Sequence, residues 1–256
     1  MHALPYSQNL QRFLDRLSLR SILTKEERQA ILSLPGHAKQ VEANVDFVAL
    51  GETVAHSCLV VAGLIGRFDQ NTNGIRQITA IHIPGDVADL HSVVQPQATS
   101  ALQALSVATV LQIPHAALRL ATAQHPALAE ILWRDCMVDA AILSQWVVNV
   151  GRREAKVRIA HLLCEMASRL GAPTAANAFS FPFMVTQVQL ADATGLTGVH
   201  VNRVLKTLRE DGLADVRRRE VTVHDWEALV AAGEFDPNYL QADIRPDERL
   251  RIVQPA

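Results

Sequence analysis

The sequence predicts an α+β protein with a β-rich N-terminal half, a long central helix and a helical C-terminal region. Three observations predict it. Short apolar stretches separated by turn residues follow one another between residues 37 and 113, which is typical of a sandwich, jelly roll or barrel. A run without a helix breaker extends over 126–150, and two short capped helical patterns follow residue 185.

The composition excludes several classes of protein. Of the 256 residues, 49% are hydrophobic and 20% are charged, so wholesale disorder is not expected. No apolar run approaches the ~20 residues of a membrane helix, and the N-terminus has no signal-peptide pattern. The three cysteines form no CxxC pair, zinc spacing or disulfide framework. We therefore expect a cytoplasmic protein that contacts no membrane and holds no structural metal.

Charge is segregated along the chain. Residues 151–220 carry 11 Lys and Arg against 7 Asp and Glu, whereas the segments on both sides are acidic. A basic segment of this kind points to a polyanionic partner. One solvated, Arg-rich helix would give the same balance, so charge alone leaves both interpretations open.

The N-terminal half begins with two predicted helices. Apolar residues share one face of 7–17, and a capping box from Thr24 to Glu27 begins a second helix that runs to about Leu32. Five strands are then expected, at 45–50, 58–62, 64–68, 75–83 and 109–113. Residues 71–74 lie between two of them and form a hairpin turn, because Asn and Gly tolerate positive φ.

The long helix is expected to start at Pro126 and to reach Val150, about 37 Å at 1.5 Å per residue. It has two apolar faces. One comprises Trp133, Cys136, Ala140, Leu143, Val147 and Val150, and the other Leu128, Ile131, Val138, Ile142 and Trp146. One face can pack on its own domain and the other on a second copy, although a helix buried within a monomer would show the same spacing.

Beyond this helix, Gly151 is expected to interrupt, residues 152–170 to form another helix, and 172–182 to form a loop. Thr186 and Gln189 then form a capping box, and Gly195 forms a turn. Thr197 caps a helix over 198–211. Two helices of about eight and fourteen residues around a glycine turn predict a helix-turn-helix.

The outer face of the second of these helices carries Val199, Asn202, Arg203 and Lys206. Arg can donate two hydrogen bonds to guanine, Asn can pair with adenine, and Val can contact a thymine methyl group. Two short strands at 214–216 and 221–223 flank three consecutive arginines and form a wing that can follow a phosphate backbone. The alternative is an ordinary helical hairpin in which Arg203 is solvated.

Together these features resemble the Crp–Fnr (cyclic-AMP receptor / fumarate-nitrate regulator) family of bacterial transcription factors. The resemblance is carried by TQVQLADATGLTGVHVNRVLKTLREDGL at 186–213, the hairpin after it, GRREAKVRIAHLL at 151–163 and the turn at 83–86. It implies an N-terminal double-stranded β-roll, of the jelly-roll, cyclic-nucleotide-binding-like type, over 1–125 and a dimerisation helix over 126–150. A winged helix-turn-helix over 151–240 and a tail over 241–256 would complete the chain.

The resemblance also implies roles and partners. Base-reading positions would be Val199, Asn202 and Arg203, and phosphate contacts would come from Gln187, Thr197, His200, Lys206, Arg217 and Arg218. Family members commonly have Glu at the position of Val199, so the preferred half-site should differ at one base pair. The implied partners are double-stranded DNA, a second copy of the chain and RNA polymerase, and no enzyme motif is present.

The effector is not identified by the sequence. The pocket implied by the family would involve Asp89, Thr99, Ser100, Leu143 and Ser144. Thr99 stands where cyclic-AMP-binding members have an Arg, and a buried phosphodiester without a cation is costly, so cyclic AMP is not expected. An iron–sulfur cluster needs four thiolates, and three cysteines cannot supply them.

Haem remains open as a cofactor, with candidate ligands His82, His91, His115, Cys58 and Cys136. A sensor module of cyclic-nucleotide or haem-binding type, whose helix-turn-helix serves a protein partner, is the alternative to a DNA-binding regulator.

Overall fold

The structure of the protein, a computed structural model, describes residues 6–242 and 244–252. The chain separates into two compact units, each described here by itself. The first comprises 1–67, 81–140 and 241–256, and the second comprises 68–80 and 141–240. Both combine helices with sheets, which confirms the predicted α+β class.

The first unit begins with the two expected helices, α1 (Tyr6–Ser18) and α2 (Lys25–Leu32). The capping box of α2 has both of its hydrogen bonds. The backbone N–H of Glu27 donates to Thr24 Oγ1 over 3.3 Å, and the backbone N–H of Thr24 donates to Glu27 Oε2 over 2.8 Å. The start of the helix predicted from the capping box is therefore confirmed.

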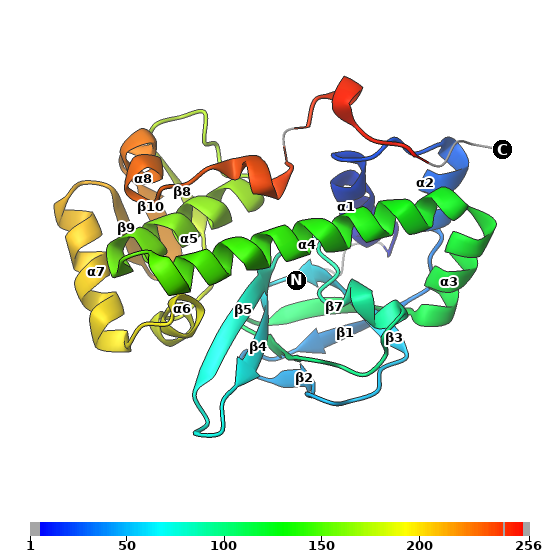
Figure 1. Ribbon diagram of the computed structural model, residues 1–256, viewed down its shortest axis with the longest axis horizontal. Coiled ribbons are helices and arrows are strands. Elements are labelled where there is room, and N and C mark those ends of the chain that lie inside the picture. Colours follow the sequence, from blue (N-terminus) through cyan, green and yellow to red (C-terminus); the bar gives the residue numbers. More distant parts are fainter. Residues whose placement is uncertain (1–5, 243, 253–256) are drawn as a thin grey trace. The chain divides into compact units, whose positions relative to one another are not determined.

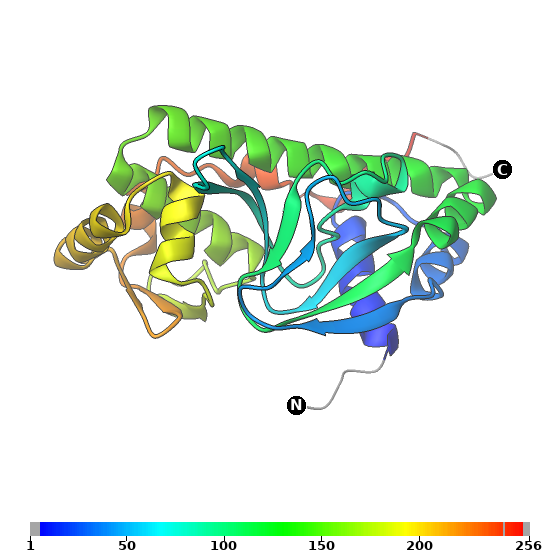
Figure 2. The same cartoon turned by 90° about the horizontal axis from the view of Figure 1, so that it is seen from below.

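Seven strands form the two sheets of the β-roll (Figure 1, Figure 2). One sheet has the order β1 (His37–Val41), β7 (Ala108–Pro114) and β3 (His56–Ala62). The other has the order β2 (Asp46–Val48), β6 (Ala101–Ala104), β4 (Ile65–Gln70) and β5 (Arg76–His82). All five expected strands are present, whereas β1 and β6 were not predicted.

Strands β3 and β7 are buried on both faces. Val60 and Val110 belong to a core cluster that draws residues from both sheets. Leu59 and Leu111 belong to a second cluster, which includes apolar residues of α1 and of the helices after the roll. Two buried faces explain why these strands appear in the sequence as continuous apolar runs rather than as alternating ones.

Helices α3 (His115–Gln124) and α4 (Pro126–Arg152) follow the roll, with a short 3-10 helix, η1 (Leu90–Val93), in the loop before β6. Helix α4 has 27 residues and runs past Val150, so the expected interruption at Gly151 was wrong. Gly151 is exposed, and a Cβ there would meet nothing within 4 Å. Glycine inside a helix costs only about 1 kcal/mol, which a long helix tolerates.

The second unit contains α5 (Ala155–Arg169), α6 (Gln187–Thr194), α7 (Gly198–Glu210) and α8 (Trp226–Ala232). Helix α5 begins at Ala155 rather than at residue 152. A three-stranded sheet has the order β8 (Phe179–Pro182), β10 (Glu220–Val223) and β9 (Ala214–Arg217). Strand β8 lies in the segment expected to be a loop, and α8 was not predicted. The 3-10 helix η2 (Pro237–Leu240) ends this unit.

Two segments each belong to a unit whose other residues are distant in sequence. The hairpin of residues 68–80 groups with the second unit, where Gln77 Nε2 lies 3.3 Å from the carbonyl oxygen of Ala193. The C-terminal segment, which includes η3 (Pro246–Glu248), groups with the first unit. There Arg251 donates to both carboxylate oxygens of Glu27, at 2.7 and 2.8 Å.

Candidate nucleic-acid interface

Two capped helices and one glycine turn build the helix-turn-helix. Thr186 Oγ1 accepts the backbone N–H of Gln189 at the start of α6, and Gly195 ends that helix with φ at 64°. Thr197 Oγ1 then accepts the backbone N–H of His200 at 3.3 Å and begins α7. The left-handed conformation at Gly195 is the one that other residues adopt only with strain.

Helix α7 presents two distinct faces. Four residues face the interior and are buried: Val201, Val204, Leu205 and Leu208. On the other side Val199 is 82% exposed, and Asn202 and Arg203 are exposed as well. In the described part of the chain no carboxylate pairs with Arg203. The guanidinium is therefore available to a ligand.

The other cations of this region are partly engaged. Lys206 Nζ lies 3.5 Å from Glu210 Oε1, one helical turn away, and both side chains are well exposed. Arg217 Nε lies 2.8 Å from Asp215 Oδ2. Exposed pairs of this kind are worth well under 1 kcal/mol, so a phosphate can displace the carboxylate.

The wing is a tight hairpin of unusual composition. Strands β9 and β10 are joined by Arg218 and Arg219, whose φ angles are 50° and 66°. Two-residue hairpin turns of this backbone type normally use Asn and Gly, because other residues are strained at positive φ. Two arginines held there are exposed at the tip of the wing. The sequence analysis expected all three consecutive arginines of the wing to follow a phosphate backbone, although it named only Arg217 and Arg218 as individual phosphate contacts.

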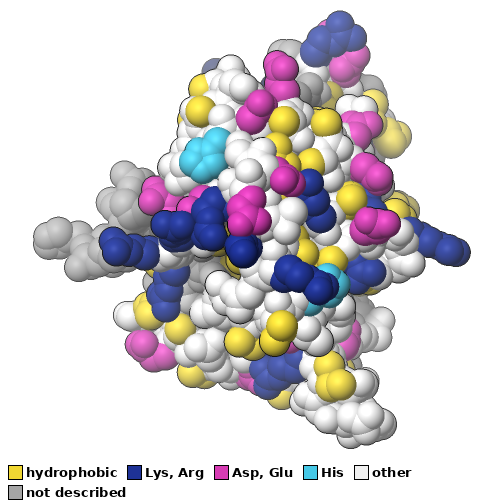
Figure 3. All heavy atoms as spheres, turned by 90° about the vertical axis from the view of Figure 1, so that its left-hand side faces the viewer, with side chains coloured by type: hydrophobic (Ala, Val, Ile, Leu, Met, Phe, Trp, Pro, Cys, Tyr) yellow, Lys and Arg dark blue, Asp and Glu magenta, His cyan; other side chains and the backbone are white. Residues whose placement is uncertain are grey.

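Gln187 and Thr197 are exposed near the N-termini of α6 and α7, and His200 is half-buried. Backbone N–H groups at helix N-termini also favour phosphate. Figure 3 shows a face of the molecule on which Lys and Arg side chains gather in a band across the middle. The helix-turn-helix thus combines outward hydrogen-bond donors with exposed cations.

The expected effector pocket is almost closed. Asp89 and Ser100 line a cavity of about 10 Å³ in the roll, and Thr99 is exposed and outside its lining. This volume is at the limit for a single water molecule, whereas ligand pockets usually enclose 300–1,000 Å³. Leu143 and Ser144 lie on the part of α4 that groups with the second unit, and both are exposed.

The cation nearest to this cavity is already engaged. Arg67 Nη2 donates to the carbonyl oxygen of Ala88 over 2.6 Å and to Asp139 Oδ2 over 2.8 Å. Asp89 Oδ1 accepts the backbone N–H of Cys58 at 2.6 Å, and its other carboxylate oxygen has no hydrogen-bond partner in the described structure. Burial raises the pKa of Asp89 to about 6.

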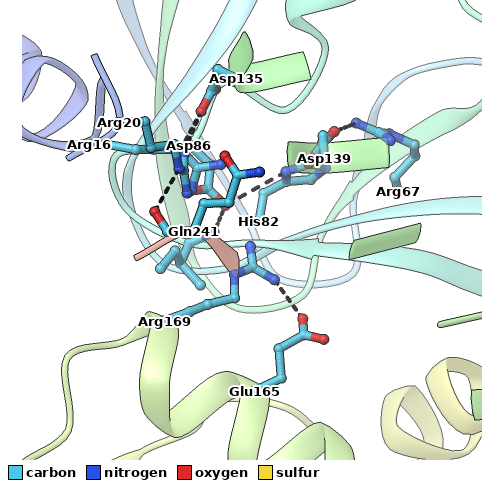
Figure 4. A network of polar contacts seen from close by, with 11 residues as sticks. Arg16, Arg20, Arg67, His82, Asp86, Asp135, Asp139, Glu165, Arg169 and Gln241 are labelled. Atoms are coloured by element: carbon cyan, nitrogen blue, oxygen red, sulfur yellow. Dashed lines mark hydrogen bonds and ion pairs between the residues drawn. The ribbon is translucent and has the colours of Figure 1, made fainter. Parts of the chain in front are cut away.

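Ion pairs join α1, the roll and the first half of α4, as Figure 4 shows. Asp135 of α4 accepts from Arg16 Nε at 3.0 Å and from Arg20 Nη1 at 2.8 Å. Arg16 also donates to Asp86, which accepts the backbone N–H of Ile83 at 3.0 Å. These groups are largely buried, and removing one partner from a buried pair is strongly destabilising.

The second half of α4 is anchored to α5 within the second unit. Trp146 Nε1 and Tyr239 Oη both donate to Glu165 Oε2 over 2.9 Å. Arg169 Nη1 donates to the other carboxylate oxygen of Glu165, also over 2.9 Å (Figure 4). Glu165 is fully buried, so its charge depends on these partners.

The two apolar faces of α4 differ in burial. Leu128, Ile131, Val138, Ile142 and Trp146 are all buried. On the other face Trp133 is 71% exposed, Val147 is 62% exposed, and Met137 and Leu143 are exposed as well. The structure thus identifies which of the two predicted faces packs within the chain and leaves the other uncovered.

The candidate haem ligands lie in different surroundings. His115 Nε2 shares a 2.8 Å hydrogen bond with Ser92 Oγ, and Cys58 is buried in the core of the roll. His91 and Cys136 line one groove. Among the described residues no group of three or more His, Cys, Asp or Glu is placed to hold a metal ion, and no described helix is long and apolar enough to cross a membrane.

Comparisons with known proteins agree with this geometry. A family model described as the Crp-like helix-turn-helix domain matches residues 157–232. The Anaerobic regulatory protein of Haemophilus influenzae is 22% identical over 217 residues, which cover 85% of this chain and 84% of that protein. The nitrogen fixation regulation protein FixK of Azorhizobium caulinodans is 26% identical over 172 residues, or 67% of this chain and 68% of that protein.

The structure of FixK2 from Bradyrhizobium japonicum has the same fold, with a TM-score of 0.71 and 24% identity, and covers 78% of this chain and 98% of that one. The two relatives from Haemophilus influenzae and Azorhizobium caulinodans are named as regulatory proteins and not as enzymes, in agreement with the sequence analysis. The helix-turn-helix domain, the relatives along most of the chain and the shared fold lead to one conclusion: residues 157–232 form a Crp-like helix-turn-helix domain, in a chain that is similar to Crp–Fnr regulators along most of its length.

Proposed function

We propose that this protein is a sequence-specific DNA-binding transcription regulator. The observation that carries the proposal is the outer face of α7, where Val199, Asn202 and Arg203 are exposed beside a wing with two arginines at its tip. Asn and Arg are the side chains that read adenine and guanine in the major groove. Lys206, Gln187 and Thr197 add phosphate contacts, which orient the helix without selecting a sequence.

The regulator acts as a homodimer. The uncovered face of α4, with Trp133, Met137, Leu143 and Val147, would expose a long apolar strip in a monomer, and such strips mark association sites. A two-fold pair of α4 helices buries the strip and places two copies of α7 on a palindromic operator. Light scattering should report twice 28.0 kDa, and a monomer at micromolar concentration would contradict this part.

The signal that controls the regulator is not cyclic AMP. The cavity at Asp89 and Ser100 has no room for a nucleotide, and Arg67 is already paired with Asp139. Calorimetry with cyclic AMP at micromolar concentration should show no binding. As a regulator of this family the protein would act in the bacterial cytoplasm and meet RNA polymerase at the promoter.

Selection of bound fragments from a random DNA library tests the proposal. The purified protein should enrich a palindrome whose half-sites lie about one helical turn, 10–10.5 bp, apart. The selection is run with and without cell extract, so that a missing effector is supplied. If neither selection enriches a sequence, the helix-turn-helix serves a protein partner and the proposed function is wrong.

A further inference from the structure

An apolar groove of about 400 Å³ lies in the first unit, apart from the closed cavity of the roll. Its walls come from η1, α3 and the first half of α4. Leu90, Leu118 and Leu132, which are all largely buried, take part in its lining. This volume is within the usual range for a small-molecule site. We propose that this groove binds a small organic acid, with the apolar body among the leucines and the acid group at Arg119.

The charge of the groove supports an acidic ligand. No Asp or Glu is among its lining residues, and Arg119 supplies the only permanent charge there. Arg119 is exposed, and its Nη1 donates to the carbonyl oxygen of Val93 over 3.1 Å. In the described part of the chain no carboxylate pairs with it. Its remaining N–H groups can therefore donate to a carboxylate or sulfonate at the rim.

The other polar groups of the lining are uncharged at neutral pH. Burial raises the pKa of Cys136 to about 11, so its thiol stays protonated. Burial, followed by the positive charge of Arg67, lowers the pKa of His91. Thr122 adds a hydroxyl. The groove is thus apolar in its depth and cationic only at Arg119, which fits an amphiphilic acid rather than a sugar or nucleotide.

The α4 wall of the groove is part of the uncovered face of α4. Its α4 residues are Ala129, Leu132, Trp133 and Cys136. Trp133 and Cys136 lie on the same side of the helix as Leu143 and Val147, and Ala129 lies on the line of Val147, five turns away. Trp133 belongs to both the groove and this face, so a ligand in the groove would contact a side chain that the proposed dimer also buries. Binding in the groove does not depend on the proposed function. Only the effect of a bound ligand on the dimer rests on it.

The test is a fluorescence titration of the full-length protein, without DNA, with two probes of similar size. One is 8-anilinonaphthalene-1-sulfonate, which carries an anionic group, and the other is the uncharged N-phenyl-1-naphthylamine. Each should bind once per chain in the micromolar range. Arg119→Gln should weaken binding of the anionic probe by about tenfold, or 1.4 kcal/mol, and leave binding of the uncharged probe unchanged.

Two matched variants locate the probe. Ala129→Trp places a large ring in the groove and should weaken binding of both probes at least tenfold. Ala123→Trp makes the same change at an exposed alanine of α3 outside the groove, and should affect neither. Circular dichroism shows whether each variant is folded.

The proposal is overturned if no saturable binding occurs, if Ala129→Trp binds as the parent does, or if Arg119→Gln affects both probes equally. Binding that appears only in a monomeric variant would show that a second copy fills the groove, which also overturns it. None of these outcomes depends on DNA, so a failure here is distinguishable from a failure of the DNA selection.

Discussion

Replacing Arg203 by Ala tests the reading face of α7 most directly. The side chain is exposed and has no carboxylate partner among the described residues, so DNA binding breaks no ion pair at this position. A bidentate contact with guanine is worth about 1–3 kcal/mol, and a dimer uses the residue twice. Arg203→Ala should therefore weaken operator binding by roughly 2–6 kcal/mol, which is at least about 30-fold.

The assay is fluorescence anisotropy with the selected operator and with a duplex changed at the base pair that Arg203 reads. Arg203→Ala should bind both duplexes equally, because discrimination at that pair is lost. Lys206→Ala is the control. This variant loses only an exposed ion pair with Glu210. It should lower the affinity for all duplexes alike, and the affinity should depend less steeply on salt concentration. If Arg203→Ala binds as tightly and as selectively as the parent, α7 does not read the sequence.

Three further predictions concern stability and assembly. Thr186→Ala removes the cap of α6 and should lower the free energy of unfolding by about 1 kcal/mol in urea titrations. Asp89 has a folded pKa of about 6, above its ordinary value, so its contribution to stability is present below pH 4 and is lost as pH rises through 6. Asp89→Asn should accordingly be more stable than the parent at pH 8, by up to about 3 kcal/mol, and equally stable at pH 4; an unchanged pH profile would show that Asp89 is not buried as described. Val147→Glu places a charge on the uncovered face of α4 and should give a monomer in light scattering, whereas a persistent dimer would place the interface elsewhere.

The helix-turn-helix was predictable because its signals are local. Thr186, Gly195 and Thr197 act on backbone groups within three or four residues, so the same hydrogen bonds form in any setting that lets these helices fold. The outward position of Arg203 then follows from helical periodicity alone. The left-handed conformation of Arg218 and Arg219 was not predictable, because these residues disfavour it and only the pairing of β9 with β10 imposes it.

The missed strands lack the features that identify a strand in a sequence. Strand β1 has one buried residue, Val41, and four exposed ones, so neither alternation nor an apolar run is visible. Strand β8 lies beside a segment rich in Ala, Pro and Asn and forms because β10 pairs with it. The groove at Arg119 could not be predicted from the sequence either, because its lining comes from three separate segments.

The boundary between the two units lies within α4, and this affects how the chain unfolds. The α4 residues up to Ala140 group with the first unit and those from Ala141 with the second, so the boundary falls within a continuous helix. The chain also crosses between the units at 67, 80 and 240. Cleavage of one peptide bond therefore cannot release either unit intact, and melting one unit removes half of a helix that the other needs. Calorimetry should accordingly record one cooperative transition for the whole chain, because the helix-turn-helix unit keeps its part of α4 only while the first unit is folded.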